Sequence, residues 1–210
     1  MRNTSNEVST LVEKVLDQNI KGENLDVLGL VVPSNLEEVG LYGLGVSLVN
    51  SARAISDHIF SKSFEKFSHE LKGLTPDQKI KFYDRYSTRD IQEFGEQAIL
   101  ILNKIEMPLA SKMMGKAHYL LVLGEISEDV YHNYCYIIKN INLYLFQEIK
   151  KIFTSSEVLF KSGVANNLYN LALLEEEYVN EFPAGPVFQG YKKSEFGNTF
   201  YFKIIKPFVD

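Results

Sequence analysis

Residues 124–129, Gly-Glu-Ile-Ser-Glu-Asp, contain the clearest helix boundary of the chain. Glycine ends helices readily because it adopts the left-handed backbone conformation without a Cβ clash. Serine begins them by accepting a hydrogen bond from a backbone N–H. The pattern therefore predicts one helix upstream, from Pro108 to Gly124. It predicts a second helix downstream, rich in Tyr, Ile and Leu, from Glu128 to about Phe153.

Similar helix signals continue toward the N-terminus. Thr75-Pro76-Asp77-Gln78 predicts a capping box with proline at the first helical position, and Ser34 with Glu37 predicts another. Apolar residues recur at helical spacing over residues 8–20, from Ser34 to about Leu71, and over 91–106. About seven helices joined by short loops in the first 155 residues predict a multi-helix bundle.

The last 55 residues differ in composition. Ser155-Ser156-Glu157 predicts a further helix start, and leucines recur at helical spacing from Asn167 to Glu177. Prolines and glycines then cluster within residues 183–190, and Val187–Gln189 before Gly190 and Tyr191 after it favour short strands. We therefore expect a mainly α protein with two parts, a helical bundle over 1–154 and a small α+β unit over 155–210.

Composition excludes several classes of protein. The 210 residues are 45% hydrophobic and 23% charged, with a net charge of −5, which excludes intrinsic disorder and argues against bulk nucleic-acid binding. The single cysteine, Cys135, excludes an internal disulfide and any multi-cysteine zinc site. This cysteine usage is typical of a reducing compartment, so we expect a cytoplasmic protein.

One segment is unusually free of charge. Val39 to Ala52 has no Asp, Glu, Lys or Arg, but it is shorter than the about 20 apolar residues that a membrane-spanning helix needs. Gly43, Ser47 and Ser51 recur every four residues, which on a helix makes a narrow face for close packing against another backbone. We expect a tightly packed helix here and no transmembrane span.

No catalytic, cofactor-binding or metal-binding residue is predicted. The four histidines, His58, His69, His118 and His132, lack the spacing of a metal site. Cys135 lies between two tyrosines on a predicted helix, where a buried thiol is expected. Nucleotide-binding and hydrolase glycine motifs are absent. Several tyrosines fit either a binding surface or the edge of a helical core: Tyr131, Tyr134, Tyr136 and Tyr144.

The C-terminal segments resemble the end of a winged-helix domain. Such domains carry a leucine-leucine-glutamate strand, a wing, a returning tyrosine strand and a serine-glutamate-x-glycine start to a last helix. Here these elements read Leu173-Leu174-Glu175, the loop around 183–186, Tyr191-Lys192-Lys193, and Ser194-Glu195-Phe196-Gly197. The resemblance implies a winged-helix-like α+β unit over about 50 residues.

The whole chain is similar to a loosely characterised group of bacterial helical proteins. The matching segments are Gly43–Ser56, Phe64–Phe67, Gly124–Ser127 and the tail. The Gly124–Ser127 turn also resembles that of tellurite-resistance TerB-like helical domains. Some members of the group are associated with phage-resistance loci, but the group implies no activity and no site residue.

Three functions follow as hypotheses. The first is a non-enzymatic interaction or regulatory protein with a protein partner or a homo-oligomeric state. The second is a DNA-binding regulator in which Lys192 and Lys193 of the wing contact nucleic acid. It is disfavoured because residues 150–210 are neutral and residues 162–174 contain no basic residue. The third is a membrane-associated defence effector acting through residues 39–52.

Overall fold

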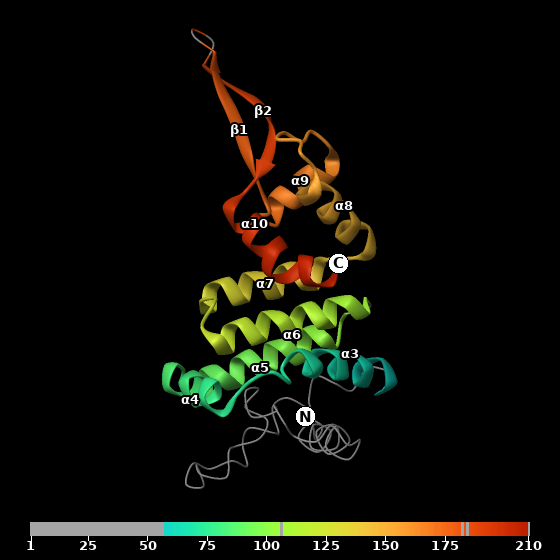
Figure 1. The fold of residues 1–210 in the computed structure, drawn as a ribbon. Coiled ribbons are helices and arrows are strands. Elements are labelled where there is room, and N and C mark those ends of the chain that lie inside the picture. Colours follow the sequence, from blue (N-terminus) through green and yellow to red (C-terminus); the bar gives the residue numbers. More distant parts are fainter. Residues whose placement is uncertain (1–56, 106, 182, 184, 210) are drawn as a thin grey trace, which may run out of the picture. The chain divides into compact units, whose positions relative to one another are not determined.

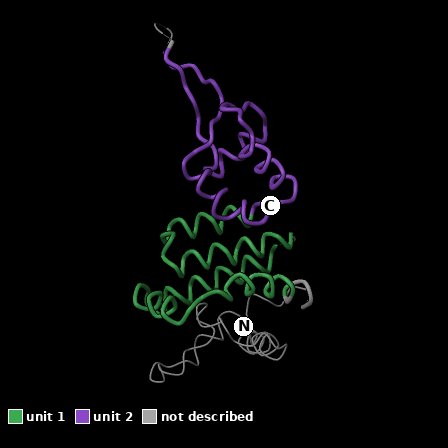
Figure 2. The backbone as a smooth tube through the Cα atoms, in the orientation of Figure 1, with its two compact units in different colours: residues 1–139 green, residues 140–210 purple. Residues whose placement is uncertain are grey.

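The computed structural model describes residues 57–105, 107–181, 183 and 185–209, and these form a mainly helical protein with one antiparallel hairpin (Figure 1). The described residues fall into two compact units that divide after Lys139 (Figure 2). The sequence pattern placed this division 15 residues later, between 154 and 155. Residues 8–20 and 34–56, including Gly43, Ser47 and Ser51, lie outside the described residues.

Five helices form the described part of the first unit, and α7 ends at its border. They are α3 (Asp57–Glu70), α4 (Pro76–Arg85), α5 (Thr88–Leu102), α6 (Pro108–Leu123) and α7 (Glu128–Asn140). Thr75 and Gln78 form the predicted capping box of α4. Ser87 and Asp90 form another at α5, so this helix begins at Thr88 rather than at Ile91.

The Gly124 boundary is confirmed. Gly124 has φ +74° and its N–H bonds to the carbonyls of Leu120 and Leu121 at the end of α6. The Arg85 guanidinium also donates to the Leu121 and Val122 carbonyls of the same helix end, where carbonyls have no partner within the helix ladder. Gly124 at the C-cap of α6 and Arg85 of α4 therefore both stabilise the end of α6.

The core of the first unit is aromatic and tightly packed. Phe82, Phe94, His118 and Tyr131 are buried with their rings in contact. Helix α6 lies close to α3 at Gly115, where a Cβ would lie 2.5 Å from the Phe67 carbonyl oxygen. A close helix approach of the kind expected at Gly43 is thus observed at Gly115.

The second unit contains α8 (Leu143–Thr154), α9 (Gly163–Asn170), β1 (Leu174–Glu181), β2 (Gly185–Lys193) and α10 (Glu195–Phe200), followed by a π-helical turn over Tyr201–Ile205 and a 3₁₀ turn over Lys206–Phe208. Strands β1 and β2 pair as an antiparallel hairpin. Among the described residues, no helix is both long enough and apolar enough to cross a bilayer.

Two expectations for this region were wrong. The helix predicted from Glu128 to Phe153 is two helices, because Asn142 caps α8 by accepting the Leu145 N–H at 2.8 Å. Residues 155–162 are not helical, and Ser162 instead caps α9. The side chain of Ser155 accepts the Glu157 N–H in a local turn that replaces the expected helix start.

The helical spacing of leucines from Asn167 to Glu177 predicts one helix over these residues, and this expectation is wrong as well. Helix α9 ends at Asn170, because Ala172 adopts φ 58° and the Leu173 N–H bonds back to the Leu168 carbonyl. This is a Schellman ending with alanine where glycine is usual. The strand predicted by Leu173-Leu174-Glu175 is therefore correct, and β2 is one continuous strand rather than two short ones.

Candidate interaction surface

The β1–β2 hairpin presents the largest group of exposed aromatic residues in the second unit, and it extends away from α9 and α10 (Figure 1). Its register pairs Leu174 with Lys193 at the base and Glu181 with Gly185 near the turn. A bulge between Glu177 and Tyr178 shifts this register midway. Because paired residues of adjacent strands share a face, the bulge determines which side chains meet.

One face of the hairpin carries Tyr178, Phe188 and Tyr191, and the ring of Tyr191 contacts that of Tyr169 on α9. We call these four rings the aromatic row. Ring centroids lie 5.7 Å apart for Tyr178 and Phe188, 5.1 Å for Phe188 and Tyr191, and 5.3 Å for Tyr191 and Tyr169. Tyr178 is 50% exposed and Phe188 41%. The row thus leaves much aromatic surface in contact with water.

Polar partners hold two of these rings. The Tyr178 hydroxyl donates to Glu176 Oε2 at 2.9 Å, and this bond raises the pKa of Tyr178. The Tyr191 hydroxyl donates to Asn166 Oδ1 of α9 at 3.0 Å. Rings fixed in this way lose little conformational freedom when a partner covers them.

The opposite face carries charges and valines. Lys192 Nζ lies between the carboxylates of Glu175 and Glu177, 3.4 Å from the first, and the bonds to Glu177 and then Glu175 raise the pKa of Lys192. Val179 and Val187 pair farther along the hairpin and are also exposed.

The two lysines predicted as DNA contacts both have partners within the protein. Lys192 is held by two glutamates, and Lys193 Nζ donates to the Ser155 carbonyl at 2.7 Å. The two strands together contain four glutamates and two lysines, a net charge of −2. A net negative charge disfavours binding to a phosphate backbone.

A helix-turn-helix joins its two helices by three or four residues. Here α8 and α9 are separated by residues 155–162, with Phe160 forming a bridge to Tyr191 of β2. A hairpin and a helix start at Ser194 are present, whereas the segment before α9 is longer than a helix-turn-helix connection. The winged-helix assignment stays a prediction.

A pocket of about 470 Å³ lies between α8, residues 155–162 and the start of α9. Its charges are mixed, with Lys151 and Lys161 opposed by Glu148 and Glu157. The rest of the lining includes Tyr144, Leu159 and Phe160. Balanced charge of this kind selects no ligand class, so the pocket adds no chemistry to the hairpin.

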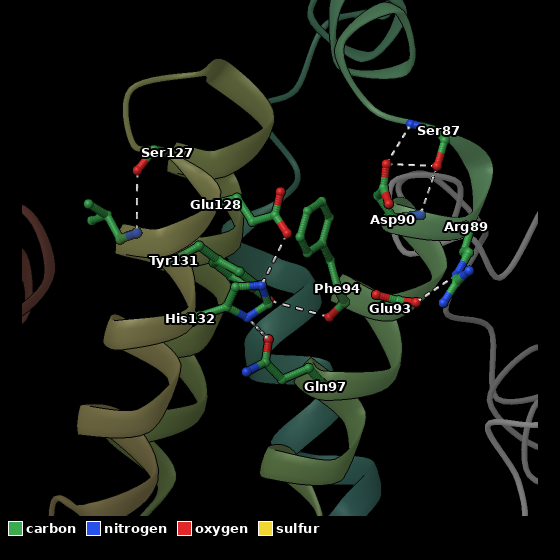
Figure 3. A network of polar contacts seen from close by, with 11 residues as sticks. Ser87, Arg89, Asp90, Glu93, Phe94, Gln97, Ser127, Glu128, Tyr131 and His132 are labelled. Carbon is green, nitrogen blue, oxygen red and sulfur yellow. Dashed lines mark hydrogen bonds and ion pairs between the residues drawn. The ribbon is translucent and has the colours of Figure 1, made fainter.

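His69, His118 and His132 do not form a metal site, and the side chain of His58 lies outside the described part of the structure. His118 is buried, with Nδ1 3.0 Å from the Tyr131 hydroxyl. His132 lies between Gln97 Oε1 at 2.7 Å and Glu128 Oε1 at 3.5 Å, while the Tyr131 hydroxyl donates to the Phe94 carbonyl (Figure 3). His69 is exposed beside Glu70. Within the described ranges, no three His, Cys, Asp or Glu side chains gather as a metal site.

Cys135 is buried, as expected, and burial raises the pKa of its thiol to about 12. The sequence left open whether four tyrosines form the edge of a helical core or a binding surface, and the structure shows two buried and two exposed. Tyr131 and Tyr134 are fully buried in the core, and Tyr136 and Tyr144 are exposed.

The sequence singled out no member of the aromatic row for binding. The available signal was an alternating strand pattern that places Glu176 and Tyr178 two residues apart, on one face. The sequence alone did not predict that Tyr178 pairs with Phe188, because this pairing depends on the bulge between Glu177 and Tyr178.

Comparison of the chain with known protein families, with curated proteins and with solved structures found no match.

Proposed function

We propose that the chain is a non-enzymatic protein-interaction or regulatory protein that binds its partner through the β1–β2 hairpin. The aromatic row supports this proposal most directly. Tyr and Phe are enriched in protein interfaces, and contiguous exposed apolar groups are uncommon on surfaces that bind nothing. An accessory role in bacterial phage resistance belongs to the same proposal and rests on the family resemblance alone.

Photo-crosslinking in cells of the source organism tests the proposal. The photoreactive residue p-benzoylphenylalanine replaces Phe188 in one variant and Tyr136 of α7, which is 58% exposed, in a matched control. We expect one discrete crosslinked protein from position 188, no crosslink from position 136, and loss of the product when Tyr178→Ala is added. Equal crosslinking from both positions, or none from 188, contradicts the proposal.

DNA binding through the hairpin is the alternative, and the engagement of Lys192 and Lys193 weighs against it. Size-exclusion chromatography coupled to light scattering, run with and without mixed-sequence duplex DNA at low salt, distinguishes DNA binding from protein binding. We expect no change in mass with DNA. A mass shift that Lys192→Ala and Lys193→Ala abolish favours the DNA-binding alternative.

The membrane-effector alternative depends on residues 39–52, which lie outside the described residues. It stays a prediction, and sedimentation of the full chain with liposomes tests it. Failure to sediment removes this alternative.

A further inference from the structure

Strand β1 has one edge with no pairing strand among the described residues. β2 occupies its other edge along all eight residues. The outer edge of β2 is itself covered at Tyr191, which exchanges two backbone hydrogen bonds with Phe160 at 2.8 and 2.9 Å. An unpaired edge presents backbone N–H and C=O groups to an added strand. A two-stranded hairpin gains stability from a third strand, since two strands alone are marginal in water.

The side chains along β1 define what an added strand must carry. One face has Glu175, Glu177 and Val179, and the other has Glu176 beside the aromatic row at Tyr178. β1 contains four glutamates and no Lys or Arg. The single ammonium of Lys192 is shared by the carboxylates of Glu175 and Glu177. Opposite charges on neighbouring strands stabilise a sheet, and like charges destabilise it.

A second copy of the chain is a poor occupant of this edge. Pairing of β1 with β1 brings together two strands that each carry four carboxylates. The complementary occupant has cations on the face of Glu175 and Glu177 and apolar side chains beside Tyr178. Because side chains alternate along a strand, this occupant is a segment in which basic and apolar residues alternate.

We propose that β1 accepts, as an added antiparallel or parallel strand, an extended segment of a partner protein that alternates Lys or Arg with apolar residues. The inference deepens the proposed function and rests on it. Main-chain hydrogen bonds along the β1 edge supply the general affinity, while the carboxylates and the aromatic row select the alternating pattern.

Fluorescence anisotropy of the full chain with a labelled synthetic peptide of alternating lysine and valine tests this inference. We expect saturable binding that weakens on the order of tenfold in the double variant Glu175→Gln, Glu177→Gln. A similar loss is expected in Tyr178→Ala. The matched controls Asp84→Asn and Tyr136→Ala, on α4 and α7, are expected to bind like the unchanged protein.

Backbone methylation of the peptide separates strand addition from simple charge attraction. In an extended peptide, alternate residues direct their N–H groups to opposite edges. We therefore expect N-methylation of one alternate set, either all valines or all lysines, to abolish binding and methylation of the other set to leave it unchanged. Equal effects of the two sets overturn the inference, as does equal binding of a peptide with lysines and valines in separate blocks.

Failure here is distinguishable from failure of the proposed function. If position 188 crosslinks one partner but the alternating peptide does not bind, the hairpin is an interaction surface and strand addition is wrong. If neither result appears, both proposals are wrong.

Discussion

At the scale of single residues, the most informative segment is Ser194-Glu195-Phe196-Gly197. The Ser194 hydroxyl accepts the Gly197 N–H at 2.8 Å and donates to the Ala172 carbonyl at 2.7 Å. A Cβ at Gly197 would lie 2.0 Å from the Leu173 carbonyl oxygen. The motif that resembles winged-helix tails therefore joins α10 to the end of α9, and its residue types are explained by capping and close packing.

Ser194→Ala is expected to lower the free energy of unfolding by about 2 kcal/mol, because the helix loses its cap and the Ala172 carbonyl loses a donor. Ser162→Ala is the matched control, since Ser162 caps α9 at an exposed position through one bond to the Ala165 N–H. Urea denaturation measures both. The explanation is wrong if Ser194→Ala costs no more than Ser162→Ala.

Cys135 is expected to be unreactive in the folded protein. With the thiol pKa raised to about 12 by burial, the thiolate fraction at pH 8 is ~10⁻⁴. Ellman's reagent should give no signal from the native chain and one thiol per chain in denaturant, because the sequence contains one cysteine. Rapid labelling of the native protein contradicts the buried assignment.

At the scale of elements, local sequence signals predicted several helix boundaries and the hairpin, whereas contacts between strands were not predicted. The caps at Thr75 and Gly124 and the hairpin around residues 183–186 follow from residues close in sequence. The end of α9 was missed because alanine, rather than glycine, takes the left-handed position at Ala172. The aromatic row was missed because a bulge sets its register, and the ion pairs of Lys192 were not predicted because its two carboxylate partners lie on the other strand.

Ala172→Gly is expected to stabilise the protein by about 0.5–1 kcal/mol, although glycine usually destabilises helices. At φ 58° alanine is strained and glycine is not. Ala165→Gly, at a buried position in the first turn of α9, is the control and should destabilise. Thermal unfolding of the two variants shows opposite shifts if this account of the helix end is right, and shifts of the same sign if it is wrong.

At the scale of the whole molecule, two compact units have different surfaces. The first unit buries an aromatic core that includes His118, Tyr131 and Tyr134, whereas the second leaves aromatic rings exposed on a hairpin. The second unit carries the proposed binding surface.

Alkaline pH is expected to unfold the chain through the core of the first unit. Burial raises the pKa of Tyr131 well above 10, and that of Tyr134 from 10 to about 12. Groups with a raised folded pKa contribute their full stability below the unfolded pKa and lose it as the pH rises through the folded one. The free energy of unfolding should therefore fall from about pH 10 to pH 12, and less steeply in Tyr131→Phe. A flat profile contradicts this assignment.

Hydrogen–deuterium exchange tests the central claim most directly, by comparing the purified chain alone with the chain bound to the partner identified through position 188. We expect slower exchange of backbone amides within residues 174–193, strongest in β1, and unchanged exchange in α4 and α7. Unchanged exchange in the hairpin, with protection in α4 or α7 instead, would contradict it.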